Sequence, residues 1–137
     1  MYKKILVPVD LAHIERLDKA ITTTTDLARH YGIPICLAGA TTTSPSEIAP
    51  TPEEFTRKLE EFWSQQAQKR GLEIETAAYP STDLAAELDY ILITAAADNG
   101  ADLMVMASHV PGFREHIFAS NAGYVASHAD VSVFVVR

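Results

Sequence analysis

The chain places chemically useful side chains directly after two of its apolar segments. Asp10 follows the run 3–9, and Ser108 and His109 follow the run 102–107. A carboxylate at the end of a buried strand either accepts a hydrogen bond from a ligand or caps the helix that follows. His109 either contacts a ligand or holds its own loop. A catalytic triad is not indicated, because no acid or serine stands at a suitable spacing from this histidine.

Three further features are candidates for ligand contacts. Ser120 and Asn121 open the last predicted helix, where free N–H groups and the helix dipole favour an anion, although plain N-capping uses the same residues. Arg114 is either a phosphate ligand or a solvated loop side chain. Gly39 ends the second apolar segment, where a missing side chain either admits a ligand or marks a strand-end bulge.

Other notable residues favour structural roles. Cys36 is the only cysteine, so an internal disulfide and a cysteine-built zinc site are both excluded, and its buried strand predicts an inert thiol. Trp63 lies beside an apolar stripe and is expected in the core, whereas Glu60 and Glu61 belong to a solvated helix face. No metal-ligand spacing is found around the remaining histidines, His13, His30, His116 and His128.

Hydrophobic periodicity predicts alternating strands and helices. Short apolar runs predict strands at 3–9, 34–40, 72–78, 102–107 and 131–136. Apolar residues at three- and four-residue steps predict helices over 17–31, 51–70, 84–95 and 121–128.

Turn and capping residues set the predicted boundaries. Thr51, Pro52 and Glu54 form a capping signature for the second helix, which Gly71 ends. Pro8 lacks a backbone donor, so the first strand should end there. The stretch 80–82 is typical of a turn, and the stretch 41–50, rich in Thr, Ser and Pro, predicts a loop.

Strands separated by helices predict an α/β fold: a three-layer α/β/α arrangement with a doubly wound, five-stranded parallel sheet. In such sheets ligands bind beyond the carboxyl ends of the strands, where the strand order reverses. Asp10 and the segment from Ala107 onward are therefore the first places to expect a ligand.

Length and composition indicate one globular domain spanning residues 1–137. Hydrophobic residues make up 47% of the chain and charged residues 21%. Acidic residues outnumber basic ones by 18 to 11, a net charge of −7, which opposes nucleic acid or anionic membrane as the main partner. No signal peptide or membrane-spanning run is evident, so a cytoplasmic location is expected.

The two ends of the chain resemble the universal stress protein family. The opening KKILVPVD matches the family's first strand and its aspartate, and MASHVPGFREHIFASNAGYVASHADVSVFVVR matches its loop, last helix and last strand. The resemblance implies a Rossmann-like sheet, of the kind found in adenine nucleotide hydrolases, with strand order 3-2-1-4-5. It also implies binding of ATP, ADP or AMP, and a homodimer through the last strand, 131–136.

The phosphate-binding motif of that family is altered here. The family has Gly-x-x-Gly, nine residues, then Gly and Ser or Thr, whereas this chain has Ala107, Val110, eight residues and Ala119-Ser120. Valine disfavours the left-handed backbone that glycine permits, although Pro111-Gly112 supplies another turn. The form A-S-H-x-P followed by S-N-A is similar to one bacterial branch of the family.

The resemblance and the residues together give one expected site and three functional hypotheses. The first is an adenine-nucleotide-binding stress-response module, with magnesium only alongside a bound nucleotide. The second is a dimeric interaction protein whose site is lost, and the third is a slow nucleotide hydrolase or self-phosphorylating enzyme, for which no base is evident. The expected nucleotide contacts are Pro8, Val9, Asp10, Gly39, Met106, Ala107, Ser108, His109, Val110, Gly112, Ala119, Ser120 and Asn121.

Overall fold

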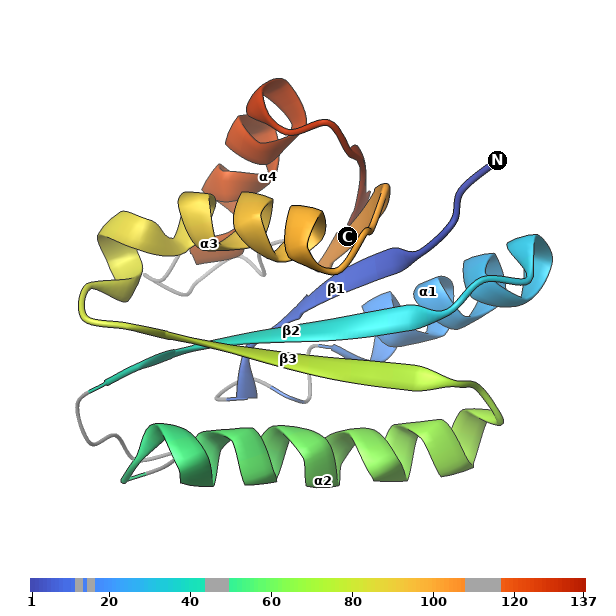
Figure 1. The fold of residues 1–137 in the computed structure, drawn as a ribbon. Coiled ribbons are helices and arrows are strands. Elements are labelled where there is room, and N and C mark those ends of the chain that lie inside the picture. Colours follow the sequence, from blue (N-terminus) through green and yellow to red (C-terminus); the bar gives the residue numbers. More distant parts are fainter. Residues whose placement is uncertain (12–13, 15–16, 44–49, 108–116) are drawn as a thin grey trace.

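The computed structural model describes residues 1–11, 14, 17–43, 50–107 and 117–137, with the backbone alone for 85 and 117–121. Strands and helices alternate along these residues (Figure 1). The strands are β1 (Ile5–Val9), β2 (Ile35–Thr42), β3 (Ile74–Ser81), β4 (Leu103–Ala107) and β5 (Ser132–Val136). The helices are α1 (Asp18–Tyr31), α2 (Pro52–Arg70), α3 (Leu84–Asp98) and α4 (Ile117–His128).

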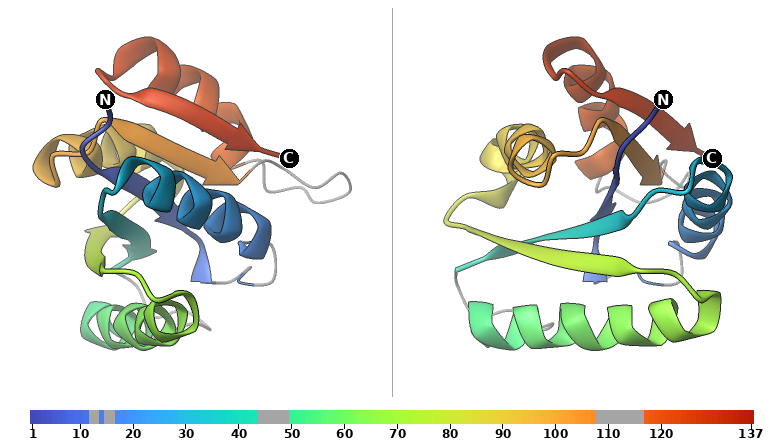
Figure 2. Two further views of the ribbon diagram at one scale, coloured as in Figure 1. Left: turned by 90° about the vertical axis from the view of Figure 1, so that its right-hand side faces the viewer. Right: turned by 45° about the vertical axis from the view of Figure 1, so that its right-hand side comes forward.

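The strands form one parallel sheet in the order β3-β2-β1-β4-β5, which confirms the expected fold. Helices α1 and α2 cover one face, and α3 and α4 cover the other (Figures 1 and 2). Each face has its own apolar cluster, because successive side chains of a strand point to opposite faces. Val7 and Val9 pack toward α1 and α2, whereas Leu6 packs toward α3 and α4.

Local signals placed the ends of α1 and α2 correctly. Gly32 and Gly71 follow these helices with φ of 65° and 63°, a conformation that glycine adopts without a Cβ penalty. At the start of α2, the Thr51 hydroxyl accepts a hydrogen bond from the backbone N–H of Glu54 at 3.2 Å. The Glu54 carboxylate pairs with Arg57, 2.8 Å away.

The predicted turn at 80–82 is wrong for Pro80 and Ser81, which belong to β3, whereas Thr82 lies in a bend. β3 continues through Pro80, which is in register with Thr41, to Ser81, which is in register with Thr42. The residues after Ala78 therefore lengthen the β2–β3 ladder, and Thr41 and Thr42 belong to that ladder and not to a loop. α3 is then capped by Asp83, whose carboxylate accepts from the Ala86 N–H at 3.2 Å. Segment 44–49 lies outside the described residues.

The predicted start of the last helix is also wrong. α4 begins at Ile117, so Ser120 is its fourth residue and cannot be the N-cap. Serine tolerates the first turn of a helix as well as the capping position, and the neighbouring alanine is the best helix former, so the serine alone did not fix the boundary.

Candidate functional site

The side of β1 that Pro8 faces decides how far β1 and β4 can pair. Neighbouring residues of a strand direct their backbone groups to opposite sides. The Ile5 N–H donates toward β2, to the Pro34 carbonyl at 3.1 Å, whereas the Lys4 carbonyl accepts from Leu103 of β4 at 3.4 Å. By this alternation Pro8, like Lys4, faces β4.

The ladder between β1 and β4 stops at that proline. Its described pairs are Ile5 with Leu103 and Leu6 with Met104. The next rung would need an N–H from Pro8, which proline does not have. Beyond this point the two strands diverge toward their carboxyl ends (Figure 2).

The expectation that the first strand ends at Pro8 is therefore correct for the pairing of β1 with β4 and wrong for its pairing with β2. β1 continues to Val9, where it remains in register with Gly39 of β2. This difference could have been predicted from which neighbouring strand Pro8 faces. That prediction requires the strand order as well as the sequence.

Asp10 follows β1 at the carboxyl edge of the sheet, where β1 and β4 diverge, and is half-buried. Val9 is 1% exposed and packs in the cluster beneath α1 and α2. The structure thus brings Asp10 and Gly39 to the same edge of the sheet, as expected from their positions at the ends of β1 and β2.

The absence of a side chain at Gly39 has a structural cause. A Cβ built there would lie 2.9 Å from Leu59 Cδ2 and 2.9 Å from Phe55 Cε1, closer than van der Waals contact allows. Both residues belong to α2. Gly39 therefore permits close packing of α2 on β2, and its small size is no independent sign of a ligand.

At the same edge of the sheet, β4 ends with Met106 and Ala107. Met106 is 1% exposed and packs in the cluster beneath α3 and α4. Ala107 is half-buried and lies in register with Val136 of β5. Met106 can therefore offer a ligand its backbone, whereas its side chain belongs to the core.

The remaining expected contacts are described less fully or not at all. Ser108, His109, Val110 and Gly112 lie outside the described residues, as does Arg114. The backbone of 119–121 lies in the first two turns of α4. Since α4 connects two parallel strands, its N-terminus is at the same carboxyl edge as Asp10.

Two titratable side chains of the described core, Cys36 and Tyr79, have raised pKa values. Burial raises the pKa of the Cys36 thiol to about 11, which agrees with the expected inert cysteine. Burial also raises the pKa of Tyr79, although a hydrogen bond from Asn99, at 3.0 Å, acts in the opposite direction. Among the described residues, no three His, Cys, Asp or Glu side chains gather as a metal site.

Trp63 is in the core, as predicted, at 3% exposed. The described helices include none that is long and apolar enough to cross a membrane.

Sequence comparison places this arrangement in a family. The family model of the universal stress protein family matches residues 1–137. The chain belongs to the universal stress protein family. Universal stress protein G of Shigella flexneri is 29% identical over 149 aligned positions, which cover all of both chains.

Solved universal stress proteins share the fold. A universal stress protein solved in complex with cAMP matches with a TM-score of 0.69 and 17% identity, over 99% of this chain and 97% of that chain. The Archaeoglobus fulgidus protein in complex with dAMP matches with a TM-score of 0.68 and 18% identity, over 99% and 98%. At these identities the likeness concerns the architecture.

Proposed function

We propose that this universal stress protein domain binds an adenine nucleotide at the carboxyl edge of the sheet, between β1 and β4. The observation that carries the proposal is the end of the β1–β4 ladder at Pro8, beside Asp10, at the point where the strand order reverses. Structural neighbours in complex with dAMP and cAMP support adenine as the base. The domain then acts as a stress-response or regulatory module.

In this proposal Asp10 accepts a hydrogen bond from the adenine amino group. The backbone of Pro8, Val9, Gly39, Met106 and Ala107 lies around the base, and the segments 108–112 and 119–121 hold ribose and phosphate. Magnesium enters only with the phosphates of a bound nucleotide. The cytoplasmic location predicted from the sequence is part of the same proposal.

Calorimetric titration with AMP, ADP and ATP tests the site. Asp10→Ala should weaken binding by about 1–2 kcal/mol, the cost of losing one hydrogen bond to a charged group. Asp26→Ala, which changes an exposed aspartate of α1, is the matched control and should leave the affinity unchanged. No heat and no thermal shift at millimolar nucleotide would overturn the proposal and favour a nucleotide-free interaction protein.

The altered phosphate motif predicts a preference within the nucleotides. Val110 disfavours the backbone conformation of a phosphate-binding nest, so AMP and ADP should bind as tightly as ATP. A tenfold preference for ATP, about 1.4 kcal/mol, would contradict this prediction.

We further propose that the domain forms a homodimer through β5. β5 is an outer strand of the sheet, and its Phe134 and Val135 side chains are 45% and 42% exposed. The Ser132 N–H donates to the Asp102 carbonyl at 3.0 Å, so by alternation the backbone of Val133 and Val135 faces away from the sheet. A two-fold partner strand would satisfy these groups and cover both side chains.

A further inference from the structure

The outer backbone of β3 has no strand beside it in the described part of the chain. β3 is the other edge of the sheet. The Thr43 N–H donates to the Ser81 carbonyl at 2.9 Å, so the odd-numbered residues of β3 face β2. Ile74, Thr76 and Ala78 therefore direct their N–H and carbonyl groups outward, and Pro80, at the next outward position, has no N–H to offer.

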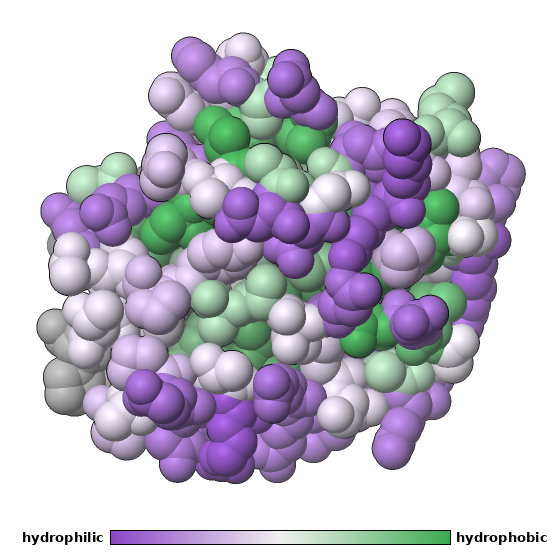
Figure 3. Space-filling model, in the orientation of Figure 1, coloured by the Kyte–Doolittle hydropathy of each residue, from purple (hydrophilic) through white to green (hydrophobic). Residues whose placement is uncertain are grey.

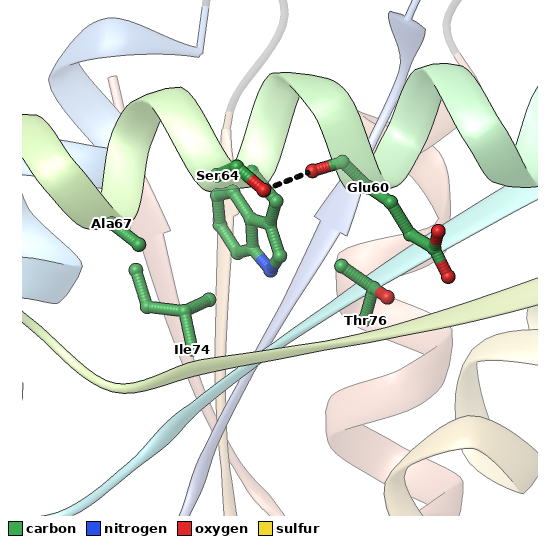
Figure 4. Close-up of a pocket in the computed structure, with 6 residues that line it drawn as sticks. Glu60, Ser64, Ala67, Ile74 and Thr76 are labelled. Carbon is green, nitrogen blue, oxygen red and sulfur yellow. Dashed lines mark hydrogen bonds between the residues drawn. The ribbon is translucent and has the colours of Figure 1, made fainter.

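A hollow of about 320 Å³ lies between this stretch of β3 and α2. Its lining comes from two elements that face each other (Figure 4). The hollow exists because α2 places the small side chains of Ser64 and Ala67 opposite the strand. The lining residues are Glu60, Trp63, Ser64, Ala67, Ile74 and Thr76.

The inner wall of the hollow is fixed in place. The Trp63 indole N–H donates to the Glu75 carbonyl at 2.7 Å. The same indole stacks on Phe62 with a ring-centroid distance of 5.9 Å and an interplanar angle of 9°. A side chain that enters this hollow would meet an ordered aromatic surface, so little conformational entropy would be lost on the protein side.

The charge of the hollow is negative. Glu60 is the charged residue among the six that line it, and its carboxylate lies at the end near Thr76 (Figure 4). Ser64 already donates to the Glu60 backbone carbonyl at 3.0 Å. Glu73, immediately before β3, is exposed, and the whole chain carries a net charge of −7. In space-filling view, neutral and hydrophobic surface over β3 lies above the hydrophilic side chains of α2 (Figure 3).

We propose that an extended segment of a partner protein adds to the outer edge of β3 and places an arginine or lysine side chain in this hollow. Backbone hydrogen bonds to Ile74, Thr76 and Ala78 hold the segment as a sixth strand. The aliphatic part of the basic side chain packs on Trp63, and its charged head pairs with the Glu60 carboxylate. Pro80 ends the added strand at one side, which fixes its register.

The tryptophan provides a direct readout, because Trp63 is the only one in the chain. The probe is a capped nine-residue peptide of alternating threonine and valine with a central arginine, titrated while Trp63 fluorescence is recorded. The expected result is a saturable change, with at least tenfold weaker binding of the same peptide carrying a central glutamate. In hydrogen exchange, the amides of Ile74, Thr76 and Ala78 should become protected when the arginine peptide binds.

Two charge-reversal variants on α2 distinguish binding in the hollow from a general effect of the protein's net charge on peptide affinity. Glu60→Lys should weaken the arginine peptide at least tenfold and strengthen the glutamate peptide. Glu53→Lys, at an exposed position of α2 outside the lining, should change neither affinity, and thermal unfolding checks that both variants fold.

Three results would overturn the proposal. The first is no fluorescence change at millimolar peptide, and the second is an equal loss of affinity in both variants. The third is concentration-dependent protection of the β3 amides without peptide, which would identify a second copy of the chain as the occupant.

Discussion

β3 and β5 are the two outer strands of one sheet, yet their surroundings differ. β3 has eight residues, and α2 anchors it through the hydrogen bond from Trp63 to Glu75. Its outward backbone is interrupted by Pro80. β5 has five residues and ends one position before the end of the printed sequence, with Phe134 and Val135 exposed on opposite faces. The two edges thus differ in what they offer a second chain: β3 offers a backbone that Pro80 limits beside a hollow with a carboxylate, whereas β5 offers exposed apolar side chains.

The largest expected effect is at β5. Val135→Lys should weaken dimerisation about 100-fold, roughly 3 kcal/mol, because each protomer would bring a charge into an apolar contact without a counter-charge. Sedimentation velocity over a concentration series measures the change. Tyr90→Lys, on α3 where the tyrosine is 72% exposed, should leave the assembly intact. A wild-type chain that sediments as a monomer at tens of micromolar would remove the contrast between the two edges.

At the β3 edge the main expected effect is on stability. Trp63→Phe should lower the free energy of unfolding by about 2 kcal/mol, because it removes the hydrogen bond to Glu75 and leaves a small cavity. Urea denaturation followed by circular dichroism measures it, with the exposed Tyr90→Phe as control. Amide exchange should accelerate at Ala77, whose N–H faces β2, more than at Phe134, whose N–H faces β4, and equal acceleration would show that α2 does not anchor β3 specifically.

The next largest expected effect is a loss of stability where α2 packs on β2 at Gly39. Gly39→Ala should cost about 1–2 kcal/mol of stability, because the new Cβ would crowd Leu59 and Phe55. Denaturant unfolding of the free protein measures this change. If nucleotide affinity falls while stability is unchanged, the glycine serves a ligand and not α2.

The smallest effect concerns the α3–α4 contact on the β5 side. Burial raises the pKa of Asp89, although the nearby His128 acts in the opposite direction, and Asp89 Oδ1 has no hydrogen-bond partner among the described residues. A raised folded-state pKa means that ionised Asp89 destabilises the fold at neutral pH and that protonation removes this cost.

Asp89→Asn should therefore stabilise the protein slightly at pH 7, by less than about 0.5 kcal/mol, because solvent screens the half-buried carboxylate. The gain should shrink as the pH falls through the raised pKa and vanish below the ordinary aspartate range. Thermal unfolding at several pH values tests it, and a gain that is the same at every pH would exclude ionisation as the cause.

The sequence was sufficient for the order of elements and for most boundaries of the first half. The capping residue Thr51 and the glycines at 32 and 71 act within a few neighbouring residues, so they can be read locally. The extension of β3 to Ser81 depends on pairing with Thr41 and Thr42, which are far away in the chain. The residues 80–82 are typical of a turn, so the local sequence favoured the wrong structure.

The candidate site was predictable only in part, because some of its features follow from the local sequence and others depend on distant elements. Asp10 and Gly39 lie at the carboxyl edge as their strand positions predicted. The packing role of Gly39 needed the position of α2, and the role of Pro8 needed the hydrogen-bonding direction of β1. The hollow beside Trp63 arises from Ser64 and Ala67, which are ordinary residues for a helix and gave no signal.

Pro8 has one consequence for the speed of binding. The end of the β1–β4 ladder is set by the covalent structure of Pro8, so it is the same with and without a ligand and does not vary with pH or salt. A ligand bound at this edge, as proposed, has no hydrogen bond from Pro8 to β4 to break. Association should then follow one diffusional step, with an observed rate that rises linearly with ligand concentration and without a plateau from slow opening.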